Sequence, residues 1–111
     1  MITADQLKDV MERTEALHHY LNIDKKRVEF EEEQLRTQAP DFWEDQKYAE
    51  EQMKKVKTLE KWIKGYENVK RLADELQLAF DFHKDELVTE EEVDDDYAKA
   101  VSAIEDLELM N

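Results

Sequence analysis

Three histidines, His18, His19 and His83, are the side chains in this sequence best suited to metal binding or proton transfer. Glu15 precedes His18 by three positions, a spacing that puts both groups on one helix face, as in di-metal carboxylate bundles. Such a centre needs a second copy of the motif on a facing helix, and the sequence has none. We therefore expect no metal and no cofactor, and a metal-dependent helical enzyme using Glu15 and His18 is a minor alternative.

Acidic runs are the next candidates for chemistry. Asp94-Asp95-Asp96 has the charge of a calcium site, but a calcium loop needs Gly at its sixth position, and Lys99 stands there. We interpret this run, and likewise Glu31-Glu32-Glu33, as the solvated acidic face of a helix. One glycine cannot build a phosphate-binding loop, and no cysteine supplies a thiolate. The sequence thus predicts no catalytic residue, and we expect that the chain is not an enzyme.

A basic row is the remaining candidate site. Its members recur at steps of three and four and so share one side of a helix. Such a row could lie along a phosphate backbone, or it could be the solvent face of an amphipathic helix. No aromatic residue on that side is placed to stack on bases, so sequence-specific reading of nucleic acid is not indicated. The candidate partner-binding residues are Lys54, Lys57, Lys61, Lys64 and Arg71.

The charge of the chain is unevenly distributed around this row. The formal net charge is −14, which argues against general adhesion to nucleic acid or anionic lipid. Residues 47–71, however, hold eight basic and four acidic residues, whereas residues 84–111 hold two basic and eleven acidic residues. The two regions could attract each other or present different faces to partners.

The basic row lies within one long segment, Tyr48 to Phe82, which holds one glycine, Gly65, and no proline. Its apolar residues keep a helical period throughout, which predicts one long amphipathic helix on which other segments pack. Trp62 flanks this stripe and either covers a groove between helices or marks a contact surface. The stripe consists of Ala49, Met53, Val56, Leu59, Ile63, Tyr66, Val69, Ala73, Leu76 and Phe80.

Two helical segments precede the long helix. Thr3 and Gln6 form the pattern of a capping box, so a helix should begin there. It ends or bends near Asn22, and helix-forming residues continue from 24 to 38. These segments are either two helices or one kinked helix. Pro40 is a firm stop, since proline disfavours helix at the residue before it.

The connector after Pro40 holds two large aromatic residues, Phe42 and Trp43, between helix-capping acids. Because leaving them in water would forgo about 1.5 to 3 kcal/mol each, we expect both rings to plug the end of a helical bundle. Asp41 is expected to form a capping box with Glu44, three residues later, and Asp45 is expected to cap the long helix.

Thr89 and Glu92 form the clearest capping box and predict a last helix over residues 90–109. The expected fold is all-α: an elongated antiparallel helical bundle on one long central helix, in a single domain over residues 1–111. The abrupt end after this helix suggests a domain boundary inside a longer protein. Without cysteines, a leader pattern or a long apolar run, we expect a cytoplasmic protein with no membrane partner.

Three segments of the sequence are familiar: Leu17–Leu21, Ile23–Lys26 and, most specifically, Ala39-Pro40-Asp41-Phe42-Trp43-Glu44-Asp45. They resemble the N-terminal helical domain of the bacterial peptide chain release factor 2 family. The resemblance implies a module of a factor that recognises UAA and UGA and triggers hydrolysis of peptidyl-tRNA on the ribosome. It also implies an arm that reaches toward the stalk base of the large subunit and cooperates with release factor 3.

The family's two chemical motifs are missing from this chain, which has no Gly-Gly pair and no Ser-Pro pair. We therefore expect a docking arm that neither reads codons nor releases peptide, with both tasks in other domains of the same factor. The alternative is a free-standing helical adaptor or coiled-coil oligomerisation protein, whose apolar stripes pair between chains.

Overall fold

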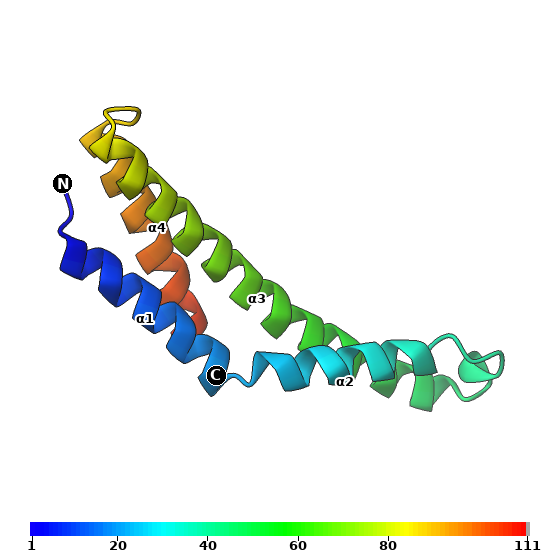
Figure 1. Cartoon of the computed structure of the whole chain (residues 1–111). Coiled ribbons are helices and arrows are strands. Elements are labelled where there is room, and N and C mark those ends of the chain that lie inside the picture. Colours follow the sequence, from blue (N-terminus) through cyan, green and yellow to red (C-terminus); the bar gives the residue numbers. More distant parts are fainter. Residues whose placement is uncertain (111) are drawn as a thin grey trace. The chain divides into compact units, whose positions relative to one another are not determined.

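The computed structural model describes residues 1–110, and within them it contains helices and no β-strand (Figure 1). The predicted all-α class is thereby confirmed. Within the same residues, no helix combines the length and the apolar character of a membrane span. The elements are α1 (Ala4–Tyr20), α2 (Ile23–Arg36), the short 3₁₀ helix η1 (Phe42–Glu44), α3 (Gln46–Lys84) and α4 (Glu90–Glu108).

Helix α3 is the long helix that the apolar period predicts, and its 39 residues extend two positions beyond the prediction at each end. At its start, the Asp45 carboxylate accepts a hydrogen bond of 3.1 Å from the Tyr48 amide, so the predicted cap is confirmed. At its end, the Leu87 amide donates to the Phe82 carbonyl at 3.0 Å. Glu86 closes this turn with φ 59°, the left-handed conformation that glycine usually supplies.

The segments before Pro40 are two helices. Asn22 separates them with φ 50° and ψ 57°, a left-handed conformation that asparagine tolerates better than most residues. The capping box at the start of α1 is confirmed, because the Thr3 amide donates to Gln6 Oε1 at 2.8 Å and the Gln6 amide donates to Thr3 Oγ1 at 3.2 Å. Helix α2 ends at Arg36, two residues earlier than predicted.

By its contacts, the chain divides into two compact units that share α3. The three-helix unit comprises Met1–Tyr20 and the chain from Tyr66 onward. In it, α1 and α4 run in the same direction and the C-terminal part of α3 runs opposite to them (Figure 1). The hairpin unit comprises Leu21–Gly65, in which α2 and the N-terminal part of α3 run antiparallel.

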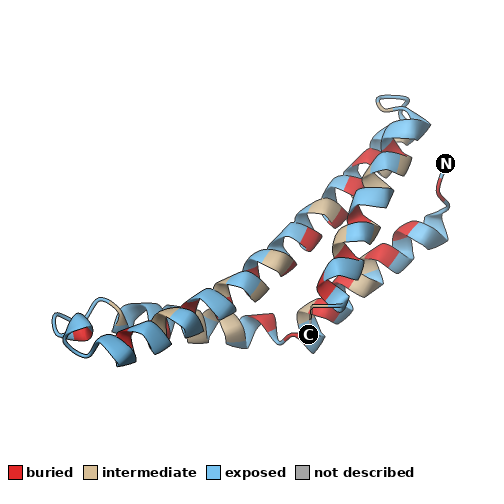
Figure 2. Cartoon of the chain, turned by 180° about the vertical axis from the view of Figure 1, so that it is seen from behind, coloured by how far each residue is buried: buried red, intermediate tan, exposed pale blue. Residues whose placement is uncertain are grey.

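The three-helix unit holds more of the buried residues than the hairpin unit does; they are coloured red in Figure 2. Two polar contacts join the N-terminal segment and α1 to α4: the Ile2 amide donates to Asp94 Oδ1 at 2.8 Å, and Arg13 Nη2 donates to Glu108 Oε1 at 2.7 Å. Asp94 therefore binds the N-terminal segment in addition to facing solvent, since 45% of its side chain is exposed. The capping box of Thr89 is confirmed. Fully buried side chains here are Val10, Val69, Ala73, Leu76, Val93, Ala100 and Ile104.

The hairpin unit buries a narrower apolar seam between α2 and α3, with Ile23, Val56 and Ile63 among its buried residues. Glu33 lies in this seam with 8% of its side chain exposed, and Lys55 Nζ reaches its Oε1 at 3.2 Å. The interpretation of Glu31 to Glu33 as wholly solvated is therefore wrong for Glu33. The reason is that α2 turns this position toward α3, where a lysine meets the carboxylate.

Candidate docking surfaces

The predicted basic row lies on the solvent side of α3. The four lysines of this row belong to the hairpin unit, and all four are exposed. We call Lys54, Lys57, Lys61 and Lys64 the Lys face. At 100° per residue, they lie on the side of the helix away from the buried stripe. From Lys54 to Lys64 the helix rises by ten residue steps, which is about 15 Å at 1.5 Å per residue.

The lysines of this face differ in their partners. Lys64 Nζ lies 2.7 Å from Glu60 Oε1, which neutralises part of its charge. Within residues 1–110, no ion pair engages Lys54, Lys57 or Lys61. These three ammonium groups are the part of the row that is available to an anionic partner.

Arg71, the fifth residue of the predicted row, belongs to the three-helix unit. Its guanidinium donates to Glu75 Oε1 at 2.9 Å and to Asn68 Oδ1 at 2.8 Å. Both bonds are local to α3 and occupy part of the guanidinium, and the role of Arg71 in partner binding stays a prediction. The sequence pattern alone did not distinguish it from the four lysines.

Trp62 and Lys55, which lie between these lysines in sequence, face α2 instead. Trp62 is half-buried, and Lys26 Nζ lies 5.9 Å from its ring centroid. This cation–π contact and the Glu33–Lys55 ion pair each join α2 to α3. Trp62 thus covers a groove between helices, the first of its two sequence-based interpretations.

The two aromatic residues in the connector between α2 and α3 differ in burial. Phe42 is 3% exposed and inserts into the hairpin, whereas Trp43 is 66% exposed, so the prediction that both rings are plugs is wrong for Trp43. The physical reason is the 3₁₀ turn η1, in which consecutive side chains diverge by about 120° and only one can point inward. Trp43 rests edge-on against Phe42, with ring centroids 5.0 Å apart.

The expected capping box of Asp41 and Glu44 does not form. Asp41 stands at the N-cap position of η1 without a side-chain hydrogen bond, and the Glu44 amide donates to the Asp41 backbone carbonyl at 3.1 Å. The tight turn uses the backbone and leaves both carboxylates outside it. Pro40 lies in this connector, four residues after the end of α2.

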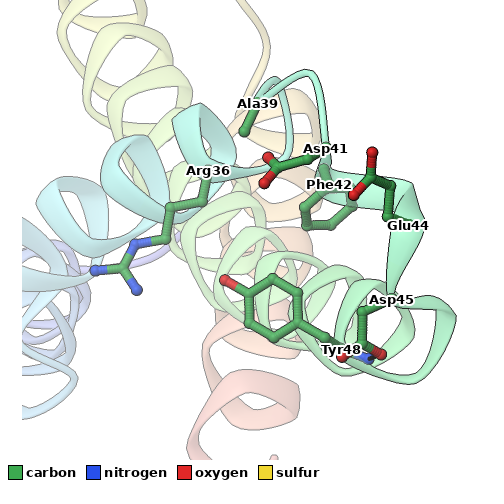
Figure 3. Close-up of a pocket in the computed structure, with 7 residues that line it drawn as sticks. All are labelled: Arg36, Ala39, Asp41, Phe42, Glu44, Asp45 and Tyr48. Atoms are coloured by element: carbon green, nitrogen blue, oxygen red, sulfur yellow. Dashed lines mark hydrogen bonds between the residues drawn. The ribbon is translucent and has the colours of Figure 1, made fainter.

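A hollow of about 380 Å³ opens beside the connector (Figure 3). Phe42 and Tyr48 contribute aromatic surface, with ring centroids 6.0 Å apart, and Tyr48 is 41% exposed. Sequence reasoning assigned Asp41, Phe42 and Trp43 to this region but missed Arg36 and Tyr48, which no local pattern connects to it. The residues that line the hollow are Arg36, Ala39, Asp41, Phe42, Glu44, Asp45 and Tyr48.

Two of the three histidines, His18 and His83, contact neighbouring residues of the fold. The ring of His18 packs edge-on against Tyr66 at 5.0 Å between centroids, and His83 Nδ1 lies 3.0 Å from the Val88 carbonyl in the turn before α4. Across residues 1–110, no three histidine, aspartate or glutamate side chains gather in a way that could hold a metal ion.

Comparison with known proteins shows a relative of this helical chain. No family model and no solved structure matches it. Over 104 residues it is 30% identical to peptide chain release factor 2 of Aeromonas hydrophila subsp. hydrophila. The match covers 94% of this chain and 27% of the length of that relative. The chain is thus a helical domain with distant similarity to a translation release factor.

Proposed function

We propose that this chain is the N-terminal module of a class I peptide chain release factor of type 2, and that it acts as a docking arm. The observation that carries the proposal is the match to peptide chain release factor 2 over 94% of the chain. The Pro-Asp-Phe-Trp segment at residues 40–43, which suggests the same family, supports it. In this role the module serves termination at UAA and UGA without reading the codon itself.

The Lys face supplies the contact in this proposal. Three ammonium groups that have no ion pair among residues 1–110 lie on one side of a continuous helix, and they can neutralise successive phosphates of ribosomal RNA. The contact is electrostatic and independent of sequence, because phosphates carry no base information. The partner surface that we propose is the stalk base of the large ribosomal subunit, and cooperation with release factor 3 follows from that position.

Burial of the apolar stripes favours this arm over the alternative of an oligomerisation module. Val56 and Ile63 are buried within the hairpin unit, and Leu76 and Ile104 within the three-helix unit. These side chains do not need a second copy of the chain to leave water. We therefore expect a monomer at micromolar concentration in sedimentation, and an obligate dimer would favour the oligomerisation alternative.

The test is co-sedimentation of the chain with ribosomes across a salt series. Each lysine that neutralises a phosphate contributes about 0.7 to 0.9 to the slope of log affinity against log salt. The triple variant Lys54→Gln, Lys57→Gln, Lys61→Gln should therefore reduce the slope by about 2 to 3.

The matched control is Lys8→Gln, Lys25→Gln, Lys99→Gln, which removes the same charge from exposed positions outside the Lys face. It should change the slope by less than one. Equal slopes for the wild type and the Lys-face variant would remove the Lys face from the proposal.

A further inference from the structure

The hollow at the connector differs in character from the Lys face. Its surface combines aromatic rings with carboxylates, and Trp43 stands exposed beside it on the buried ring of Phe42. A large aromatic side chain held on a buried support and left in water is typical of an anchor at a protein interface. The volume of about 380 Å³ is near the lower end for ligand pockets, which suits one side chain better than a metabolite.

The charge of this hollow is negative. Asp41, Glu44 and Asp45 line it, and Arg36 is its one cationic lining residue among those described. In Figure 3 the guanidinium of Arg36 points away from the carboxylates of Asp41 and Glu44. Arg36 Nη1 instead lies 4.0 Å from Glu33 Oε1, in the α2–α3 seam.

The carboxylates of the hollow differ in whether another group of the chain already binds them. Asp45 Oδ1 holds the amide of Tyr48 as a helix cap. Within the described residues, neither a hydrogen bond nor an ion pair engages the carboxylate of Asp41 or Glu44. Two carboxylates beside aromatic faces form the environment that a guanidinium or ammonium group prefers.

We propose that this aromatic hollow binds an Arg or Lys side chain of a basic protein segment, with an apolar neighbour of that segment packed on Trp43. The negative charge excludes a phosphate backbone, so this surface and the Lys face select opposite classes of partner. The inference goes beyond the proposed ribosomal RNA contact and stands on a different set of residues. It would therefore remain if the Lys face proved not to bind RNA.

The test uses the 111-residue chain and a defined peptide. The probe is an acetylated ten-residue amphipathic peptide with two arginines and three leucines, titrated into the ¹⁵N-labelled chain. Trp43 and Trp62 give separate indole N–H signals in the spectrum. We expect a saturable shift of the Trp43 signal and of the Tyr48 amide, with the Trp62 signal unchanged.

Variants identify the groups responsible. Asp41→Asn with Glu44→Gln should weaken binding about fivefold or more, as expected for loss of two charge-assisted contacts. Trp43→Ala should weaken binding about tenfold. Because the Trp43 ring is exposed, this variant should keep the fold of the wild type. Circular dichroism of each variant should match that of the wild type.

Two controls separate recognition from general attraction to an acidic protein. The variant Glu31→Gln with Glu32→Gln removes the same charge from exposed positions on α2 and should bind like the wild type. A peptide with citrulline in place of arginine keeps the shape, loses the charge and should not bind. Equal weakening by the two acidic double variants, or equal binding of the citrulline peptide, would overturn the proposal.

Discussion

The connector allows a sharp test of packing, because two neighbouring aromatic residues are predicted to differ widely in their contribution to stability. Phe42 is 3% exposed, and replacing a buried phenylalanine by alanine typically costs about 3 to 5 kcal/mol. Trp43 is 66% exposed, so about one third of its surface is removed from water. For a side chain of about 240 Å², that is about 80 Å², or about 2 kcal/mol at 25 cal/mol per Å².

The value for Trp43→Ala is an upper bound, because an unfolded chain already shields part of its apolar surface. We therefore expect Phe42→Ala to lower the free energy of unfolding by about 3 to 5 kcal/mol and Trp43→Ala by at most about 2 kcal/mol. Urea unfolding followed by circular dichroism at 222 nm measures both values on one scale. Equal losses in the two variants, or a larger loss for Trp43→Ala, would refute the assignment of Phe42 as the buried plug.

Three further predictions concern the three-helix unit and the cooperativity of the chain. Glu86→Gly should raise the free energy of unfolding by up to about 1 kcal/mol, because glycine adopts φ 59° without the steric strain that glutamate has there. A lower melting temperature of the variant would show that the Glu86 side chain contributes more stability than this strain removes. The hydrogen bond to Asp74 raises the pKa of Lys70 above its ordinary value. That pair therefore stabilises the fold at pH values below about 10.4 and loses its effect as the pH rises through the raised pKa. Asp74→Asn should accordingly be less stable than the wild type at pH 9 and closer to it at pH 11.5, whereas a constant difference would contradict this origin. Finally, Trp43 and Trp62 both lie in the hairpin unit, so tryptophan fluorescence follows the unfolding of that unit alone. If the chain unfolds as one cooperative domain, fluorescence and circular dichroism should give the same urea midpoint. Two different midpoints would indicate that the units unfold independently.

The sequence predicted the helices well because their signals are local. Apolar residues at steps of three and four located α3 to within two residues at each end, and the capping boxes at Thr3 and Thr89 marked helix starts that the structure confirms. In each case the residues that determine the element are neighbours in the chain. Asn22 likewise marks a break because its own backbone adopts the left-handed conformation.

The errors arose where the outcome depends on which surface a residue meets. The local pattern made Glu33 one of three similar glutamates, yet its position opposite Lys55 buries it. Phe42 and Trp43 look equivalent in sequence, and the geometry of a single 3₁₀ turn decides which ring enters the hairpin. The hollow at the connector combines Arg36 and Tyr48 from different helices, and such a combination is specified by tertiary packing alone.

We propose that this chain docks on the ribosome and carries no release chemistry. The most direct test of this proposal uses purified termination complexes with UAA in the decoding site and a labelled peptidyl-tRNA. Ribosome-bound chain and released peptide are measured in the same samples at low salt. The account predicts saturable binding with peptide release at the level of the blank. Release of peptide by the chain alone, or the absence of binding at any salt concentration, would contradict it.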